Sequence, residues 1–390
     1  NSSAASDVYK RQETHSATAG PGPPYGGRTL PRQLSTDTLA LWRRTAVTDD
    51  SYLRWLVNET RTIWWHDSAQ PAELRRGFAH GATGVTTNPV LTLKTVRSDP
   101  ERWGAALQGR EGLSPRQRAE TLMGAVTRNA AEMFMPVYER TQGRLGYVCA
   151  QVDPALAGER EAMLEMARRF HSWAPNIAVK LPVTAAGLDV CEECAAEGIT
   201  ITMTVSYTVP QVLASAERYR MGLARLRKTG KAPGECFAVI MIGRLDDYLR
   251  EVAHDQKAGV SESDITQAGL AVTKRAYSLF KKRDYRTVLI VAALRGNYHM
   301  VEMAGAELIM SIHPKYQALL LEPGVPRDPE RISASVDPEV VERLKTIPEF
   351  VRAYEPDGIA PEEFVTYGVT QRTLSQFHAI GWAGLEAFGA

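Results

Sequence analysis

The stretch that decides the fold is residues 176–206, NIAVKLPVTAAGLDVCEECAAEGITITMTVS, in which two short β-like runs flank one amphipathic helical run. Lys180 lies in the first run, among apolar residues over a length typical of a strand covered on both faces, as in a parallel sheet. Desolvation disfavours a buried ammonium group, so such a lysine has a lowered pKa and its amine can attack carbonyl carbon. Lowering a lysine pKa from about 10.4 to about 7 requires roughly 4 to 5 kcal/mol. Lys180 is therefore the leading candidate for a reactive group, and the alternative is a structural lysine that is paired or reaches solvent.

The second run, residues 199–206, alternates polar and apolar residues with the period of a β-strand. Its polar face consists of hydroxyl residues, Thr200, Thr202, Thr204 and Ser206. Polar residues inside and apolar residues outside are what a strand of a βα barrel needs near its catalytic end, because helices cover the outer face.

The same unit repeats along the chain. Eight β-like runs, each followed by helical sequence, occupy residues 62–67, 84–88, 146–153, 176–183, 199–206, 236–243, 287–293 and 307–313. This alternation predicts an α/β fold, the eight-stranded parallel (β/α)8 TIM barrel. An open doubly wound sheet is the competing architecture, although no G-x-G-x-x-G motif follows the first run.

The flanking segments differ in composition from this repeat. Residues 1–33 begin without methionine and are rich in Ser, Gly and Pro, which predicts a disordered segment or an artefact of cloning or sequence assembly, and no signal peptide. Helical patterns follow at residues 35–42 and 50–58. We expect the barrel to span residues 34–321, and residues 322–390 to form a helical extension that packs on it and is placed to close its mouth.

Composition excludes several classes of protein. The chain has 390 residues, 44% of them hydrophobic, and can bury a large core. Its 46 basic and 45 acidic residues leave no excess of positive charge of the kind that binds a nucleic-acid backbone. No apolar run approaches the ~18 residues of a membrane span. Four cysteines at this length suggest a reducing compartment, so we predict a cytoplasmic protein. The pair Cys191 and Cys194 has the C-x-x-C spacing, but it lies in a helical pattern without a second pair to complete a zinc site.

Reacting groups of such barrels lie at the carboxyl ends of the strands. The first run ends at Asp67, which is a candidate acid/base or, alternatively, the N-cap of the next helix. The sixth and seventh runs lead to Arg244 and Arg295, whose guanidinium groups suit the capture of a phosphate, although each alone is more often part of a surface ion pair. Tyr298 and His299 follow closely, and either could enter the site.

Four short motifs, one per strand and in the same order, resemble those of the transaldolase family. They are GVTTNPVL at residues 84–91, VKLPVT followed by EGITITMTVS, IGRLDDY, and AALR. The resemblance covers residues 62–313 and, more faintly, the C-terminal helices. Members of this family are βα barrels that form a Schiff base with a ketose, so the resemblance implies that fold and that chemistry, with no cofactor or metal.

The resemblance also implies a role for each matching residue. Lys180 would be the Schiff-base lysine, and Asp67 the acid/base that handles the C4 hydroxyl of the sugar during C3–C4 cleavage. Thr86 and Asn88 would bind the dihydroxyacetone portion of the substrate. The remaining matches are Thr202, which stands where the family usually has asparagine, Thr204, which matches the threonine that holds the catalytic water, and the phosphate ligands Arg244 and Arg295.

The chain departs from the family pattern at several positions. Gln151 stands where most transaldolases have glutamate, and it resembles the fructose-6-phosphate aldolase branch of the superfamily. Val239 and Ala293 replace serines, and Met241 replaces an aromatic residue. Because glutamine cannot accept a proton, acid/base chemistry through water would have to rest on Asp67 or on another group. The connection 207–235 is also longer than usual in the family, and we expect its charged helix to have a solvated face.

Three functions remain open from the sequence. The first is a transferase that moves a dihydroxyacetone unit from a ketose phosphate to an aldose phosphate, as in the pentose phosphate pathway. The second is a lyase that releases free dihydroxyacetone, which Gln151 favours. The third is a sugar-phosphate binding homologue that has lost the chemistry. All three predict that the ligands are phosphorylated sugars and that there is no nucleic-acid or membrane partner. All three are also compatible with a homo-oligomer.

Overall fold

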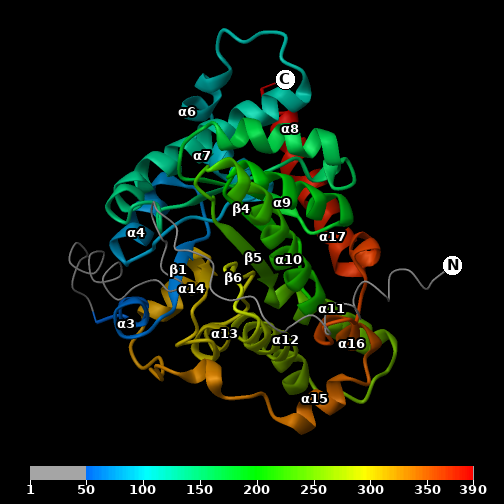
Figure 1. Cartoon of the computed structure of the whole chain (residues 1–390). Coiled ribbons are helices and arrows are strands. Elements are labelled where there is room, and N and C mark those ends of the chain that lie inside the picture. The colour runs from blue at the N-terminus through cyan, green and yellow to red at the C-terminus, as the bar shows by residue number, and fades with distance from the viewer. Residues whose placement is uncertain (1–49, 390) are drawn as a thin grey trace, which may run out of the picture. The chain divides into compact units, whose positions relative to one another are not determined.

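The computed structural model describes residues 50–389, which all belong to one compact unit (Figure 1). The predictions for residues 1–33 and for a helix at 35–42 fall outside the described residues. The domain boundaries at 34–321 and 322–390 stay predictions. The first described helix, α3 (Tyr52–Glu59), begins after Ser51, whose side chain caps it by accepting a hydrogen bond from the backbone of Arg54.

Seven parallel strands form one sheet in the order β1-β7-β6-β5-β4-β3-β2. Each of them lies inside a run predicted from the sequence. The strands are β1 (Ile63–His66), β2 (Val148–Gln151), β3 (Ile177–Pro182), β4 (Ile201–Thr204), β5 (Cys236–Met241), β6 (Val288–Ala292) and β7 (Ile309–Ile312).

The second predicted run does not form a full strand, but it joins the two edges of this sheet. Val85 makes parallel bridges to both β1 and β2. Its backbone N–H donates to the carbonyl of Tyr147 (2.8 Å), and its carbonyl accepts from Cys149 (2.9 Å). On the other side, the N–H of His66 donates to the carbonyl of Gly84 (2.9 Å). The sheet therefore closes on itself, and the predicted TIM-barrel-like fold is confirmed with one strand reduced to a short bridge.

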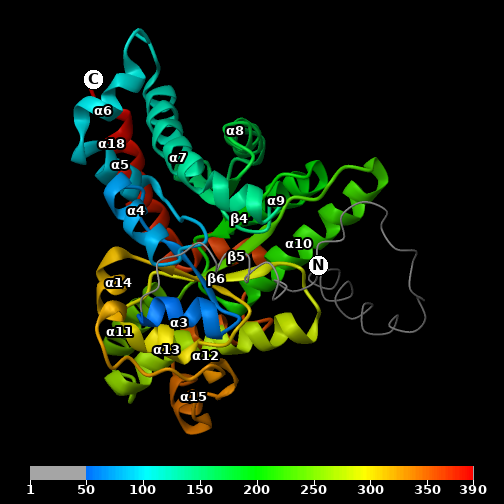
Figure 2. The same ribbon diagram turned by 90° about the vertical axis from the view of Figure 1, so that its left-hand side faces the viewer.

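Helices cover the outside of the sheet (Figures 1 and 2). They begin at recognisable caps: a capping box at Ser114 starts the longest helix, and the side chains of Thr184 and Thr208 cap two others. The main ones are α4 (Pro71–Ala79), α5 (Pro89–Ser98), α7 (Pro115–Arg140), α8 (Arg160–His171), α9 (Ala185–Glu197), α10 (Val209–Leu226), α11 (Ile242–Asp255), α12 (Glu262–Lys282), α13 (Asn297–Glu302) and α14 (Pro314–Leu321). No helix in the described part of the chain is long and apolar enough to cross a bilayer.

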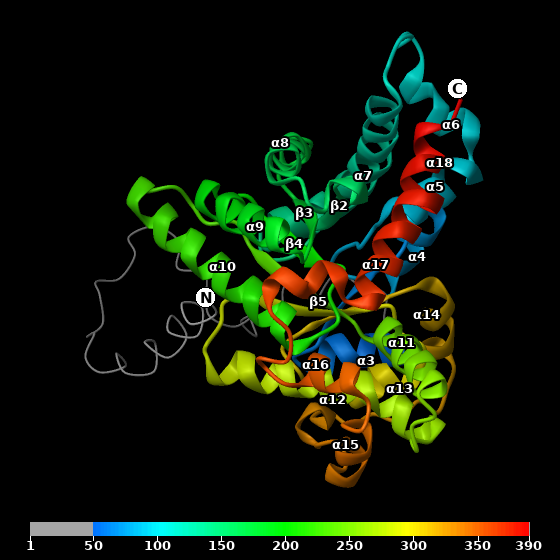
Figure 3. The same cartoon turned by 90° about the vertical axis from the view of Figure 1, so that its right-hand side faces the viewer.

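The C-terminal extension contains α15 (Pro338–Leu344), α16 (Pro348–Tyr354), α17 (Gly368–Gln376), the π-helical segment η6 (Phe377–Trp382) and α18 (Ala383–Glu386). Figure 3 shows α15 and α16 in orange and the last helices of the extension in red, with α18 running beside α5 and α7. The backbone of Gly381 comes so close to Pro89 that an added Cβ would lie 2.6 Å from the Pro89 carbonyl carbon. The extension thus packs on residues that directly follow the second predicted strand.

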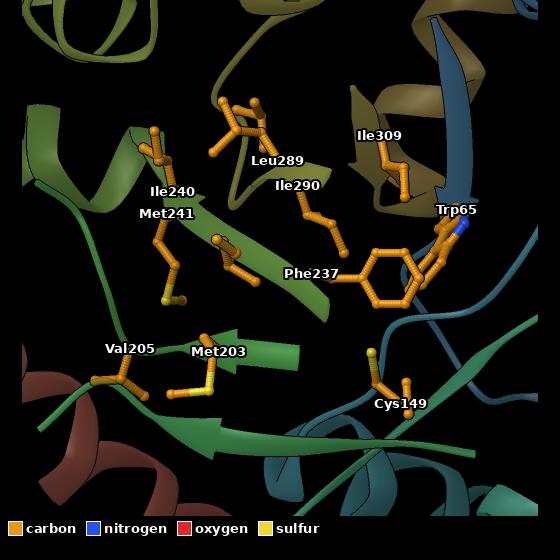
Figure 4. Packing of buried hydrophobic residues seen from close by; sticks show 14 of the residues in the cluster. Trp65, Cys149, Met203, Val205, Phe237, Ile240, Met241, Leu289, Ile290 and Ile309 are labelled. Carbon is orange, nitrogen blue, oxygen red and sulfur yellow. The ribbon is translucent and has the colours of Figure 1, made fainter. Parts of the chain in front are cut away.

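Aromatic rings fill the amino-terminal end of the barrel. The ring of Phe237, near the start of β5, contacts Trp65 edge-on at 4.8 Å between centroids (Figure 4) and Tyr147 at 5.5 Å. All three side chains are buried, so each contributes a large apolar area and the favourable geometry of an edge-to-face pair. This layer closes one end of the barrel and leaves the polar residues of the strands for the other end.

Gly84 lies where the closure of the barrel leaves no room for a side chain. A Cβ there would lie 2.7 Å from the Trp65 ring and 2.8 Å from the backbone carbonyl of Tyr147. We expect Gly84→Ala to lower the free energy of unfolding by about 1 to 3 kcal/mol, because backbone or core must shift. Gly158→Ala is the matched control, since nothing lies within 4 Å of its added Cβ. Urea unfolding of both variants checks this, and equal midpoints would contradict it.

Candidate active site

The amine of Lys180 is buried inside the barrel. The residue is 6% exposed, and its Nζ donates a hydrogen bond to the backbone carbonyl of Thr87 (3.0 Å). Burial lowers the pKa of Lys180 below its usual 10.5, and the positive charge of Arg244 acts in the same direction, whereas Cys149 and Asp67 oppose it. The structure therefore brings a desolvated amine into the electrostatic range of the carboxyl group of Asp67. The prediction that Lys180 is a reactive amine requires this arrangement.

The strand register places three predicted site residues in one row. Lys180 is paired with Gln151 on one side and with Thr202 on the other, so the three side chains share a face of the sheet. Thr204 lies two residues further along on the same face and is also fully buried. Gln151 Oε1 and Thr204 Oγ1 are buried and form no hydrogen bond with any described residue. Buried polar atoms are normally paired, so these two oxygens are available to a ligand or a water molecule.

Asp67 follows β1 and is held by a hydroxyl group. Thr86 Oγ1 donates to Asp67 Oδ1 (2.7 Å) and also lies 2.6 Å from Ser311 Oγ. The alternative role of Asp67, as cap of the next helix, is not what the structure shows: the N-cap of α4 is Gln70, without a side-chain cap. The carboxylate is therefore left for another use. Ser311 was missed by the sequence analysis, because a single serine among apolar residues shows no alternation of the kind that placed Thr202 and Thr204 inward.

The backbone and side chains of residues 86–88 connect the amine to the carboxylate. Thr86 contacts Asp67, the carbonyl of Thr87 accepts from Lys180, and the hydroxyl of Thr87 donates to the carbonyl of Cys149 (2.7 Å). The side chain of Asn88 caps α5 by accepting from the backbone of Leu91 (3.0 Å). Thr86 and Asn88 thus have partners within the protein, and their predicted contact with the dihydroxyacetone portion stays a prediction.

The backbone is strained where two strands end. Val205, directly after Thr204, has φ 55°, a conformation that is a genuine outlier for a β-branched residue. Ala293, two residues before Arg295, has φ 58°. Strain of this kind costs roughly 1 to 3 kcal/mol and persists only where the surrounding structure imposes it, often at functional sites. Both positions lie at the end of the barrel that carries Lys180 and the arginines.

Arg244 is tied to the C-terminal extension. Its Nη1 donates to Gln376 Oε1 (2.7 Å) and contacts Thr373 Oγ1 (3.4 Å), and its guanidinium carbon lies 5.3 Å from the Phe377 ring centroid. Burial lowers the pKa of Arg244, and the neighbouring charge of Arg295 adds to this effect. Two guanidinium groups that repel each other, one half-buried and one exposed, favour the binding of an anion between or beside them.

Arg295 is an exposed residue with its own ion pair. Its Nε and Nη2 donate to Asp247 Oδ2 (2.9 and 2.6 Å), and its Nη1 donates to the carbonyl of Ala293 (2.7 Å). The ion pair that the sequence left as an alternative is therefore present. Asp247 also pairs with Arg250 (3.0 Å), so an incoming anion could replace it at Arg295 without leaving it unpaired. The phosphate role of Arg295 stays a prediction.

His299 is fully buried behind Arg295 and is not exposed to the site. Its Nδ1 accepts a hydrogen bond from the backbone N–H of Arg295 (3.2 Å), and its Nε2 lies 3.0 Å from Asp246 Oδ2 without the alignment of a hydrogen bond. Burial raises the pKa of Asp246, and His299 opposes that shift. His299 therefore supports the turn that carries Arg295. The sequence analysis found neither the contact of His299 with Asp246 nor that of Arg244 with Gln376. Each contact joins two segments of the chain, and no motif in either segment indicates that they meet.

The fold and these side chains together give a parallel βα barrel whose candidate site, at the carboxyl ends of the strands, is centred on a lysine. Residues 64–360 match the family described as Transaldolase/Fructose-6-phosphate aldolase, and the chain belongs to this family.

Curated relatives agree with the family. The chain is 31% identical over 229 residues to a protein named Transaldolase from Neisseria gonorrhoeae, a match that covers 57% of this chain and 62% of that protein. It is 28% identical over 245 residues to Transaldolase 2 of a Nostoc species (58% and 62%) and 29% identical over 242 residues to Transaldolase 1 of Streptomyces avermitilis (58% and 63%). The chain thus spans less than two thirds of the length of these relatives.

The lowered pKa of Lys180 has a consequence for stability that can be measured. At pH values between the folded-state pKa of Lys180 and 10.5, the unfolded chain binds more protons at this residue than the folded protein does. The free energy of unfolding therefore rises with pH in this range and falls again as the pH is lowered. We expect Lys180→Met to be more stable than the wild type at neutral pH, by a margin that shrinks as the pH approaches 10.5. Urea unfolding of both proteins at a series of pH values checks this. Curves that run parallel throughout would contradict it.

Proposed function

We propose that this chain is a transaldolase that transfers a dihydroxyacetone unit from a ketose phosphate to an aldose phosphate through a Schiff base on Lys180. The observation that carries the proposal is the desolvated amine of Lys180, whose pKa is lowered by burial and which lies within the electrostatic range of Asp67. The relatives named Transaldolase support the same reaction.

The first half of the reaction follows from these two groups. Lys180 Nζ attacks the C2 carbonyl carbon of the ketose, and loss of water gives an iminium ion. Asp67 takes the proton of the C4 hydroxyl, the C3–C4 bond breaks, and its electron pair moves into the iminium to form an enamine. The aldehyde half leaves. Because the iminium accepts the electrons, this step is balanced without any further reagent.

The second half reverses these steps with another aldehyde. The enamine carbon attacks the acceptor carbonyl, Asp67 returns the proton to the new hydroxyl, and water then hydrolyses the iminium and frees Lys180. Thr204 and Gln151 present buried oxygens without partners in the described structure, which suits the binding of that water. Glutamine can orient a water molecule but cannot take its proton, so proton transfer rests on Asp67.

Arg244 and Arg295 supply the site for the phosphate group of the substrates. The guanidinium of Arg244 is already oriented by Gln376 and packed on Phe377, so little of its conformational freedom remains to be lost on binding. This arrangement favours phosphorylated sugars over free ones. The distant end of the substrate would thereby fix the position of its C2 carbonyl against Lys180.

Gln151 favours a second reaction of the same site. In a lyase, water protonates the enamine, and dihydroxyacetone leaves after hydrolysis. The residue is buried beside Lys180 in the strand register, where it could hold that water. A binding homologue without chemistry is the third function, and the absence of a second carboxylate and a serine at the usual positions motivates it.

Covalent trapping separates the enzymes from the binding homologue. We expect borohydride reduction in the presence of fructose 6-phosphate to add the mass of the reduced ketose or of its three-carbon fragment to the peptide that contains Lys180. Lys180→Ala should show no added mass. Mass spectrometry of digested protein provides the measurement, and a label on any other residue would overturn the assignment of Lys180.

Turnover with a single substrate separates transferase from lyase. We expect fructose 6-phosphate alone to give at most one equivalent of glyceraldehyde 3-phosphate per site, and erythrose 4-phosphate to restore continuous turnover. A coupled assay for glyceraldehyde 3-phosphate follows both reactions. Steady turnover without the acceptor would instead establish the lyase.

Removal of the arginine tests the phosphate site. Hydrogen bonds to charged groups contribute about 1.5 to 3 kcal/mol, so Arg244→Ala should raise KM for fructose 6-phosphate roughly 10- to 150-fold. Rates with unphosphorylated fructose should change little. Arg168→Ala, which removes an exposed arginine paired with Glu197 on α8 and α9, serves as the control. An equal loss on both sugars would remove the phosphate role of Arg244.

A further inference from the structure

A pair of hydroxyl groups stands behind the carboxylate of Asp67, and counting their protons fixes the direction of the hydrogen bonds. Thr86 has one hydroxyl proton, and it is donated to Asp67 Oδ1 (2.7 Å), since an ionised carboxylate can only accept. The contact of 2.6 Å between Thr86 Oγ1 and Ser311 Oγ must then use the proton of Ser311. The hydrogen bonds therefore run from Ser311 to Thr86 to Asp67.

Both hydroxyl groups belong to rigid parts of the barrel. Ser311 lies in β7 and is paired in register with Trp65 of β1, two residues before Asp67. Thr86 follows the bridge at Val85, and its backbone N–H donates to the carbonyl of His66 (3.0 Å). Ser311 and Thr86 are each only 2% exposed. Water therefore does not compete for these hydrogen bonds, and the geometry is held by the sheet rather than by a mobile loop.

The arrangement leaves the two oxygens of Asp67 in different states. Oδ1 is occupied by Thr86, whereas Oδ2 forms no hydrogen bond with any of residues 50–389. The residue as a whole is only half-buried. One oxygen thus fixes the carboxylate, and the other is free to take a proton from a substrate hydroxyl.

We propose that Ser311 is a positioning residue for Asp67, which it orients through Thr86 so that Oδ2 faces the substrate hydroxyl. This inference rests on the proposed function, because it needs Asp67 to act as the acid/base of C3–C4 cleavage. It also reassigns Thr86, whose hydroxyl is used within the protein, from binding the dihydroxyacetone portion to holding the carboxylate.

The test compares Ser311→Ala with two matched variants. A single neutral hydrogen bond contributes about 0.5 to 1.5 kcal/mol, so Ser311→Ala should lower kcat roughly 2- to 12-fold. KM should change less than about 2-fold, because Ser311 does not touch the substrate. Ser311→Thr keeps the hydroxyl and should keep most of kcat. Ser215→Ala removes another fully buried serine hydroxyl, which donates to the carbonyl of Gln211 on α10, and should leave kcat unchanged.

A double variant examines whether Ser311 acts through Thr86. Once Thr86→Val has removed the intermediate hydroxyl, adding Ser311→Ala should lower kcat no further, since the chain of hydrogen bonds is already broken. Losses that multiply would overturn the relay. So would a Ser311→Ala enzyme with the kcat of the wild type.

Borohydride trapping on Lys180 tests the proposed Schiff base independently of the role of Ser311. Schiff-base formation does not need Asp67 to be oriented for C4 deprotonation, so Ser311→Ala should trap the ketose as the wild type does while cleaving it more slowly in a single turnover. If the wild type is trapped and Ser311→Ala cleaves at the same rate, the inference fails and the proposed function stands. If the wild type is not trapped, the proposed function fails, and the inference with it.

Discussion

The exclusion of water from the amine of Lys180 is the constraint on which the rest of the site depends. An ammonium group is stable in water and unfavourable in an apolar interior, so the closed sheet around β3 shifts this lysine toward its neutral form. The aromatic layer of Trp65, Tyr147 and Phe237 closes the end of the barrel away from the strand ends, and the hydrogen bond to Thr87 fixes the amine without supplying a negative charge. A carboxylate in place of that carbonyl would have stabilised the charged form instead.

The short segment from Gly84 to Asn88 joins the parts of the site. It closes the sheet through Val85, holds Asp67 through Thr86, accepts from Lys180 through the carbonyl of Thr87, and starts α5 at Asn88. Fold and chemistry therefore depend on the same five residues. The C-terminal extension is connected to the same region, since Gly381 packs against Pro89 and Gln376 binds Arg244. A change in the extension should thus affect Arg244 before it affects the amine of Lys180.

Periodicity in the sequence was sufficient to find the seven strands of the sheet and the inward residues Lys180, Thr202 and Thr204. Lys180 stood out because it interrupts an apolar run, and Thr202 and Thr204 because they alternate with apolar residues. The second strand was overestimated, because α5 has its N-cap at Asn88, only three residues after Val85, and this leaves no length for a ladder. A surface ion pair of Arg295 was left as an alternative without a named partner, because a sequence shows charges but not which of them meet; the structure gives Asp247 as the partner.

Other parts of the site could not be predicted, for a common physical reason. Ser311 meets Thr86 across 225 positions, and Gln376 meets Arg244 across 132, so no local pattern relates the partners. His299 looked like a residue of the site because it follows Arg295 closely, but one turn of α13 directs its ring into the interior toward Asp246. Such contacts follow from the closure of the barrel and from helix direction, which become known only with the fold.

The most direct test of this account is an NMR titration of the Lys180 side chain, with selectively labelled lysine and the Lys180→Met protein to assign the signal. The account predicts a pKa clearly below the 10.5 of an unperturbed lysine, together with slow exchange of the amine protons with water. A pKa at or above 10.5 would show that the amine is solvated or paired with a charge, and would contradict the account.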